Sequence, residues 1–306
     1  MVKQEQVKIN DEHIANSVYD DSLPAAYRAA LAHASEIGSS VKSMPEVLVL
    51  KGKAPFNNPI WKTWYTCNQE EDVGTTLQGN KVMIGVAGGG ILTPERTETA
   101  YERGLTKQRA AYLAESEIQA LLAGKLADGT EISVYSFADF RNGIKDLPRR
   151  YAVVMDFDMA KKAASGYLEV ETLRDNPLVI VRAGGVAEAN AFVDKVAQRY
   201  TQYGNHHPFS AIDPNETQGR VLFVGGDDSS GLKGDNLYYL GRFLVGVAPE
   251  ALVGAERRAP QTRQELPAEK GIIAPTLEEV LAIGTPFVTP IALDQFRVEM
   301  QKLYKQ

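Results

Sequence analysis

The chain of 306 residues is 44% hydrophobic and 24% charged, which are ordinary values for a globular protein, and its formal net charge is −6. Acidic chains are poor non-specific binders of nucleic acid, because that binding depends on Lys and Arg side chains that neutralise phosphates. One cysteine, Cys67, excludes an intramolecular disulfide framework. The N-terminal segment lacks the apolar core of a signal peptide, and no apolar run reaches the ~20 residues that span a bilayer. We therefore expect a cytoplasmic protein with neither a nucleic-acid nor a membrane partner.

The first hundred residues predict alternating helices and strands. Residues 1–22 are polar and are expected to form an irregular arm, and a helix is expected from Pro24 to Ile37. A strand is predicted over Glu46–Leu50. A loop excursion with Gly, Pro and Asn follows over residues 51–80. Its aromatic side chains either line a ligand pocket or form a core beneath the loop; they are Phe56, Trp61, Trp64 and Tyr65.

The next segment predicts a strand followed by a helix. Residues 81–87 form an apolar run that ends in three glycines. The helix begins at Thr93, because Thr is a favoured N-cap and Pro94 then occupies the first helical position. A further helix is the clearest of the chain and is predicted over Val186–Tyr203, with an apolar stripe along one face.

Three short apolar runs dominate the central part of the sequence and lie at residues 151–156, 177–182 and 220–225. Each is followed by Gly or Asp, a pattern typical of strands buried on both faces of a parallel sheet. The predicted fold is therefore α/β, with a mostly parallel sheet flanked by helices, a less regular C-terminal part and a long N-terminal loop excursion. The predicted organisation is an N-terminal arm and helix (1–45), an α/β core domain (46–247) and a C-terminal linker with a helical segment (248–306).

Acidic residues follow two of these runs and define the first candidate site. Asp156 and Asp158 end one run, and Asp227 with Asp228 follows another. Parallel strands carry ligands at their carboxyl ends, and carboxylates suit Mg²⁺ or Mn²⁺. The leading hypothesis is thus a divalent-metal-dependent hydrolase that acts on a small phosphorylated or anionic substrate, with Asp156 and Asp158 as catalytic groups and all four acids as metal ligands. The alternative is that these acids cap the element that follows them.

Glycine-rich turns define the second candidate site. Gly88, Gly89 and Gly90 precede a helix, and exposed amide groups at such a position bind anions. Arg182 lies beside Gly184 and Gly185, so this turn is predicted to complement an anion as well. The alternative is a tight-turn role for the glycines, because neither spacing matches a known phosphate-binding pattern.

Two further hypotheses belong to other functional classes. Cys67 with His206 or His207 would make a cysteine-dependent hydrolase or transferase if the side chains meet in the fold. A non-catalytic subunit of a homo-oligomeric assembly is the other alternative, because the long extended segments suit wrapping around neighbouring copies. Whether the protein is an enzyme stays open at this stage.

Overall fold

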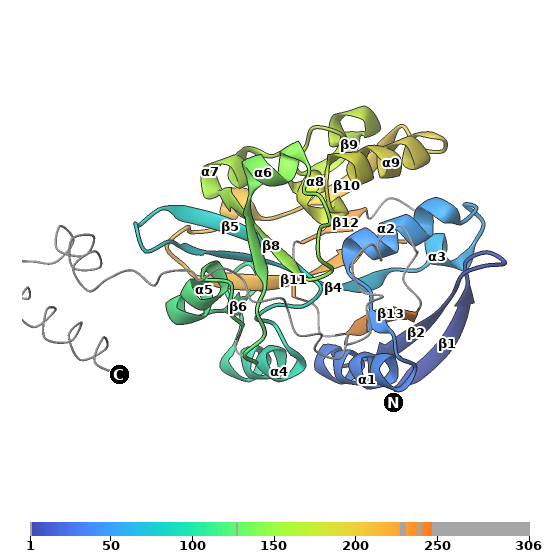
Figure 1. Ribbon diagram of the computed structural model, residues 1–306, viewed down its shortest axis with the longest axis horizontal. Helices are drawn as coiled ribbons and strands as arrows, with labels where there is room; N and C mark the ends of the chain where they lie inside the picture. Colours follow the sequence, from blue (N-terminus) through green and yellow to red (C-terminus); the bar gives the residue numbers. More distant parts are fainter. Residues whose placement is uncertain (1, 127, 227–230, 235, 238–239, 247–306) are drawn as a thin grey trace, which may run out of the picture. The chain divides into compact units, whose positions relative to one another are not determined.

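One large sheet forms the centre of the computed structural model, which describes residues 2–126, 128–226, 231–234, 236–237 and 240–246 (Figure 1). The strands of this part are β1 (Lys3–Lys8), β2 (Ile14–Asp20), β3 (Ser40–Val41), β4 (Tyr65–Thr75), β5 (Lys81–Ala87), β6 (Ala111–Tyr112), β7 (Ser133–Ser136), β8 (Tyr151–Asp156), β9 (Gly166–Glu169), β10 (Gln202–His206), β11 (Gln218–Val224), β12 (Leu232–Lys233) and β13 (Gly241–Gly246).

Helices cover both faces of the sheet. They are α1 (Leu23–Glu36), α2 (Met44–Lys53), α3 (Pro59–Lys62), α4 (Pro94–Arg103), α5 (Glu115–Leu122), α6 (Phe137–Asn142), α7 (Phe157–Lys162), α8 (Pro177–Ala183) and α9 (Val186–Ala197), with 3-10 turns at Val170–Leu173 and Phe209–Ala211. One apolar core joins the sheet to α2, α3 and α6–α9, and a second core on the other face joins it to α1, α4 and α5 (Figure 1).

The sheet is mixed and mainly antiparallel. Its main path runs β1-β2-β13-β4-β11-β12-β10-β9, and β5, β8 and β7 extend from β4. Parallel pairing within the described residues is confined to β10–β12, β13–β4 and β7–β8. The central strand β4 pairs antiparallel with both β5 and β11. The prediction of a mostly parallel α/β sheet is therefore wrong.

Two of the predicted strands are helices, and each has a cap that explains why. Residues 46–50 lie in α2, where the Ser43 side chain and backbone both bond to Glu46. Residues 177–182 lie in α8, where the Asn176 side chain accepts from the amides of Leu178 and Val179. A short apolar run suits a buried helix as well as a strand, so the caps decide the outcome.

The expected N-terminal arm and loop excursion are also part of the sheet. Residues 3–20 form the hairpin β1–β2, and the excursion contains β4, the strand at the centre of the sheet. β4 is buried along almost its whole length although its sequence is polar, YTCNQEEDVGT. Alternating or continuous apolar residues mark most buried strands, so a polar strand of this kind gives no sequence signal.

The chain divides into two compact units, Met1–Arg257 and Arg258–Gln306. All described residues belong to the first unit, and the predicted linker and helix of 248–306 lie outside them. No helix in the described part of the chain has the length and apolar character needed to cross a membrane.

Candidate functional site at one end of the sheet

Four strands bring their ends together at one end of the sheet. β2 ends at Asp20, opposite Gly241 at the start of β13, and Arg242 lies directly opposite Tyr19. β13 in turn pairs with the start of β4, and the end of β11 pairs there with Tyr65. Segments that are more than two hundred residues apart in sequence therefore form one surface.

The side chains at this end form a half-exposed group that we call the sheet-end surface, made of Tyr19, Trp64, Leu240 and Arg242. The Arg242 guanidinium carbon lies 4.8 Å from the Tyr19 ring centroid and 5.6 Å from that of Trp64. The two rings meet edge to face with centroids 6.4 Å apart. A cation–π contact, such as the two that Arg242 makes, contributes roughly 0.5–1 kcal/mol at an exposed site. Leu240 is 38% exposed.

The polar groups of the sheet-end surface differ in whether they have a hydrogen-bond partner. Tyr19 donates its hydroxyl hydrogen to Asp21, which raises the pKa of Tyr19. The backbone amide of Arg242 donates to Thr66 Oγ1 at 3.2 Å. The Arg242 guanidinium, in contrast, makes no hydrogen bond or ion pair with any residue that the structure describes, and its Nε is buried without an acceptor.

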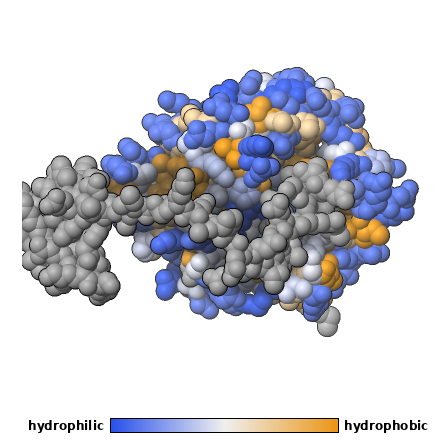
Figure 2. All heavy atoms as spheres, viewed as in Figure 1, coloured by the Kyte–Doolittle hydropathy of each residue, from blue (hydrophilic) through white to orange (hydrophobic). Residues whose placement is uncertain are grey.

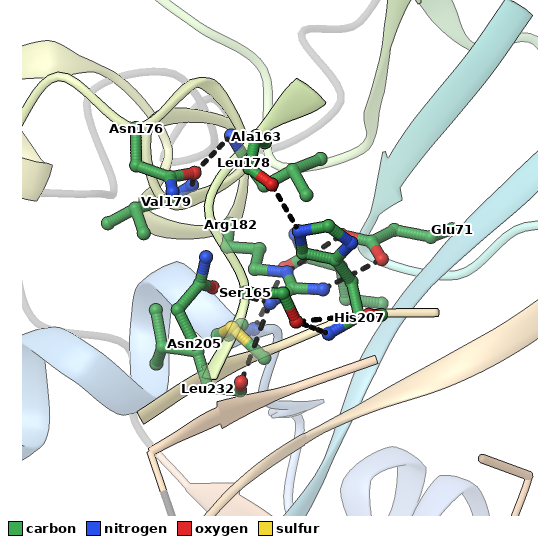
Figure 3. Close-up of polar contacts among 12 residues, drawn as sticks. Glu71, Ala163, Ser165, Asn176, Leu178, Val179, Arg182, Asn205, His207 and Leu232 are labelled. Carbon is green, nitrogen blue, oxygen red and sulfur yellow. Dashed lines mark hydrogen bonds and ion pairs between the residues drawn. The ribbon is translucent and has the colours of Figure 1, made fainter. Parts of the chain in front are cut away.

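A fully buried polar group, which we call the Arg182 network, is made of Glu71, Arg182, Asn205 and the Leu232 carbonyl (Figure 3). Arg182 donates Nε and Nη2 to the two Glu71 oxygens at 2.7 and 2.9 Å, and Nη1 to Asn205 Oδ1 at 2.7 Å. Its Nη1 also lies 3.5 Å from the Leu232 carbonyl oxygen. The network therefore joins α8, β4, β10 and β12 through one bidentate ion pair.

His207 lies beside the Arg182 network and is held neutral. Burial, followed by the charge of Arg182, lowers the pKa of His207 to about 4. Its Nε2 bonds to the Ala163 carbonyl at 3.2 Å, and its backbone exchanges hydrogen bonds with Ser165 (Figure 3). These contacts hold the end of β10 in place without adding a second charge.

The described glycines between β11 and β13 lie close to the surrounding chain. The amide of Gly225 donates to the Gly231 carbonyl at 2.7 Å, and Lys51 Nζ donates to the Gly225 carbonyl at 2.7 Å. Gly231 has φ +64°, and a Cβ there would lie 1.9 Å from the Gly204 carbonyl oxygen. At Gly234 a Cβ would lie 2.6 Å from both Arg182 and Glu71. A larger side chain would collide with its neighbours at Gly231 and Gly234, so these two positions require glycine.

Two of the predicted anion-binding glycines, Gly90 and Gly185, lie next to a carboxylate of the protein itself. The turn of Gly88, Gly89 and Gly90 follows β5, and the amides of Ile91 and Leu92 donate to the Glu70 side chain at 2.5 and 2.9 Å. A Cβ on Gly90 would lie 2.1 Å from Glu70. The amides after the glycines thus hold an internal anion.

The second glycine turn closes one helix and begins another. Gly184 ends α8 in the left-handed conformation, and Gly185 precedes α9, with its Cβ position 2.5 Å from Glu188. Arg182, predicted to complement an anion, does so with Glu71. The structure therefore places a carboxylate of the protein beside Gly90, Gly185 and Arg182.

Only half of the predicted acidic site lies within the described residues. Asp156 accepts a hydrogen bond from the Met159 amide at 3.1 Å and caps α7, and Asp158 is exposed in the first turn of that helix. Asp227 and Asp228 lie outside the described residues. In the described ranges, no three His, Cys, Asp or Glu side chains gather in a way that would hold a metal ion. The parallel sheet that motivated a magnesium-dependent hydrolase is absent, and that prediction is corrected.

The thiol of Cys67 lacks the features of a catalytic nucleophile. The thiol is fully buried in β4, 4.0 Å from the Tyr65 carbonyl, and burial raises the pKa of Cys67. Nucleophilic cysteines have a lowered pKa and an exposed thiol. His206 packs its ring against Tyr167 at 5.2 Å.

The predicted aromatic cluster is divided between core and surface. Trp61 and Tyr65 are 1% exposed, and Phe56 packs on Trp61 at 4.7 Å. Trp64 alone reaches the sheet-end surface. Tyr19 and Arg242 gave no sequence signal, because strand pairing and not sequence proximity brings them to Trp64.

A groove of about 470 Å³ lies between α2 and α9. Its lining includes Leu48 and Phe192, with Lys53 and Lys195 among its charged residues. Figure 2 shows hydrophobic residues as separate patches on a largely hydrophilic face. Exposed large hydrophobic residues of the described part are likewise scattered along the chain, and single residues of this kind are ordinary on protein surfaces.

Comparison with known proteins yields one structural relationship. No family model matches the sequence, and no curated protein matches it. A solved structure from work on the accommodation of massive sequence variation in Nanoarchaeota by the C-type lectin fold is similar to this chain with a TM-score of 0.59. The alignment covers 78% of this chain and 100% of that one at 24% identity.

The chain therefore has a C-type lectin fold, which agrees with the large, mainly antiparallel sheet flanked by helices. This finding overturns the predicted parallel α/β class and its association with a magnesium hydrolase.

Proposed function

We propose that this protein is a binding protein that recognises its partner through the sheet-end surface. The observation that carries the proposal is the group of half-exposed aromatic and arginine side chains at that end of the sheet. Tyr19 and Trp64 lie against the Arg242 guanidinium, which has no oxygen acceptor among the described residues. Aromatic and arginine side chains are the residues that most often dominate binding energy at interfaces.

The composition of the adjoining segment supports the same conclusion. Between β11 and β13 the sequence contains Asp227, Asp228, Ser229 and Ser230, followed by Asp235, Tyr238 and Tyr239. Tyr, Ser and other small polar residues are typical of surfaces selected for recognition, because tyrosine offers a large contact area at a low cost in conformational entropy. The similar Nanoarchaeota structure is described as accommodating massive sequence variation. A polar segment of this composition suits that role here.

The proposal is tested by comparing two leucine substitutions at opposite ends of the sheet. Leu240 is 38% exposed in the sheet-end surface, and Leu77 is 83% exposed in the turn between β4 and β5. Wild type, Leu240→Asp and Leu77→Asp would be applied to the same arrays of proteins and glycans, with thermal unfolding as a check on folding.

We expect wild type and Leu77→Asp to bind the same defined subset of array members, and Leu240→Asp to lose that binding while it stays folded. Equal binding by the two variants would contradict the proposal, as would an absence of selective binding by the wild type. A homo-oligomeric state stays a prediction and is read from the sizing profile of the same samples.

A further inference from the structure

Resting on the proposed function, we propose that Arg242 is the specificity-determining residue of the sheet-end surface and that it binds a carboxylate of the ligand. The ligand class is thereby narrowed to molecules that present a planar, singly charged carboxylate beside an apolar or aromatic group. Three observations carry this inference: the missing acceptor, the stacking geometry and the surrounding charge.

Arg242 is exceptional among the arginines that are buried or half-buried in the described part of the chain. Each of the others donates to an oxygen atom of the protein; they are Arg96, Arg149, Arg150, Arg174, Arg182 and Arg220. Arg242 donates its guanidinium hydrogens to no described residue. Its two terminal nitrogens carry four of the five guanidinium donors, and they are open to an acceptor that a ligand supplies.

The stacking geometry fixes how that acceptor would approach. Tyr19 and Trp64 lie against the guanidinium at 4.8 and 5.6 Å, and Nε is buried. The two terminal nitrogens are the remaining donors, and they form a fork that matches the two oxygens of a carboxylate. The rings restrict the fork to few orientations, which lowers the entropy lost on binding. Trp64 is next to the fork and is available for an apolar group of the same ligand.

The nearby acids do not satisfy this arginine. Asp21 accepts the Tyr19 hydroxyl hydrogen, and Asp20 accepts the Ser22 amide at 2.9 Å. Both acids contribute negative charge near Tyr19. A doubly charged phosphate would be repelled by these groups more strongly than a singly charged carboxylate, because Coulomb energy scales with the charge of the ligand. The chain as a whole is also acidic, with a net charge of −6.

The first test uses two small probes on the full-length wild-type chain, sodium benzoate and its neutral analogue benzamide. Both offer the same ring to Trp64, and only benzoate offers a carboxylate to Arg242. Binding is followed by NMR through the indole N–H signals of Trp61 and Trp64, which a Trp64→Phe variant assigns. We expect benzoate to shift the Trp64 signal saturably and at least ~10-fold more tightly than benzamide, the scale of one charge-assisted hydrogen bond.

The second test uses matched arginine substitutions. Arg242→Lys keeps the charge and removes the planar fork, and Arg141→Lys makes the same change at an exposed position in α6. We expect Arg242→Lys to weaken benzoate binding ~10-fold and Arg141→Lys to leave it unchanged. Equal affinity for benzoate and benzamide in the wild type would overturn the inference even if Arg242→Lys failed to fold. Wild-type affinity in a folded Arg242→Lys variant would overturn it as well.

The source of the carboxylate is separated by two larger probes. One is a peptide that ends in a free glutamate, paired with its C-terminal amide and side-chain glutamine analogue; the other is an oligosaccharide that ends in glucuronate, paired with its glucose analogue. Binding of either acidic probe above its neutral partner supports the inference and identifies the source, and no preference in either pair contradicts it. Selective array binding through Leu240 without any carboxylate preference would leave the proposed function intact and refute the role of Arg242 alone.

Discussion

Two arginines of this protein, Arg182 and Arg242, show how differently one side chain can be used within one sheet. Arg182 is fully buried, and all its partners are fixed groups of the chain. Arg242 is half-buried, lies against two aromatic rings and has no oxygen acceptor among the described residues. The first arrangement specifies where four elements meet, and the second leaves a charged fork available for a ligand. The contrast indicates that stability resides in the Arg182 network and recognition in the sheet-end surface.

The largest effect is expected when the buried pair is broken. Arg182→Met leaves the Glu71 carboxylate buried without its partner, so it should lower the free energy of unfolding by about 3–5 kcal/mol. Urea unfolding measures the loss. The double variant Arg182→Met/Glu71→Gln removes the stranded charge and should recover a large part of it. A loss below ~1 kcal/mol in the single variant would show that the network does not support the fold.

A somewhat smaller effect is expected at the anchor of the β11–β13 segment. Gly231→Ala forces a side chain into the left-handed region and against the Gly204 carbonyl, and it should destabilise the protein by about 2–4 kcal/mol. Gly52→Ala is the matched control, because that glycine lies in α2 with no atom within 4 Å of its Cβ position. It should stabilise by roughly 0.5–1 kcal/mol. Equal thermal shifts in the two variants would contradict this difference.

Asp72 follows Glu71 on the opposite face of β4, and its substitution should stabilise the protein where the preceding two destabilise it. Asp72 is fully buried, and its carboxyl group lies beside that of Glu70. Burial, followed by the charge of Glu70, raises the pKa of Asp72 well above its usual range. Native Asp72 therefore keeps its proton to a higher pH than unfolded Asp72, so this residue makes stability fall as pH rises above the unfolded-state pKa.

Asp72→Asn removes the ionisable group at constant size. We expect it to stabilise the chain by on the order of 1 kcal/mol at pH 7 and to have a smaller effect near pH 4, where wild-type Asp72 is protonated in the native state and increasingly so in the unfolded state. Urea unfolding at both pH values checks the prediction. A variant that is less stable than wild type at pH 7 would show that Asp72 is a satisfied charge.

The smallest effect on stability is expected at the other arginine. Arg242→Gln removes two weak cation–π contacts and no ion pair, so it should cost less than ~1 kcal/mol. Thermal unfolding of Arg242→Gln beside Arg182→Gln gives the comparison directly. If the two substitutions proved equally destabilising, the division between a structural and a recognition arginine would fail.

Local elements were predictable from sequence wherever caps and periodicity agreed. The helix beginning at Thr93-Pro94 is α4, and the apolar run of residues 81–87 is β5. Residues 186–197 of the predicted helix are α9. These elements are specified by neighbours in sequence, which is the information that a single chain provides.

The fold and the candidate site were not predictable in the same way. The central strand β4 is polar because its acids are buried against Arg182 and the amides of Ile91 and Leu92, and these partners come from distant parts of the chain. The run of residues 177–182 predicts a strand, because a buried strand and a short helix buried on all sides have the same composition. Tyr19 and Arg242 meet through strand pairing across 223 positions of sequence.

The central claim is that the protein binds its partner through the sheet-end surface. Hydrogen–deuterium exchange of the full-length chain, with and without a ligand selected on the arrays, tests it most directly. The account predicts that bound ligand slows exchange in the peptides covering Ser17–Asp21, Lys62–Thr66 and Leu240–Leu244, where the four strand ends meet. Protection confined to the groove between α2 and α9, with unchanged exchange at the sheet end, would contradict it.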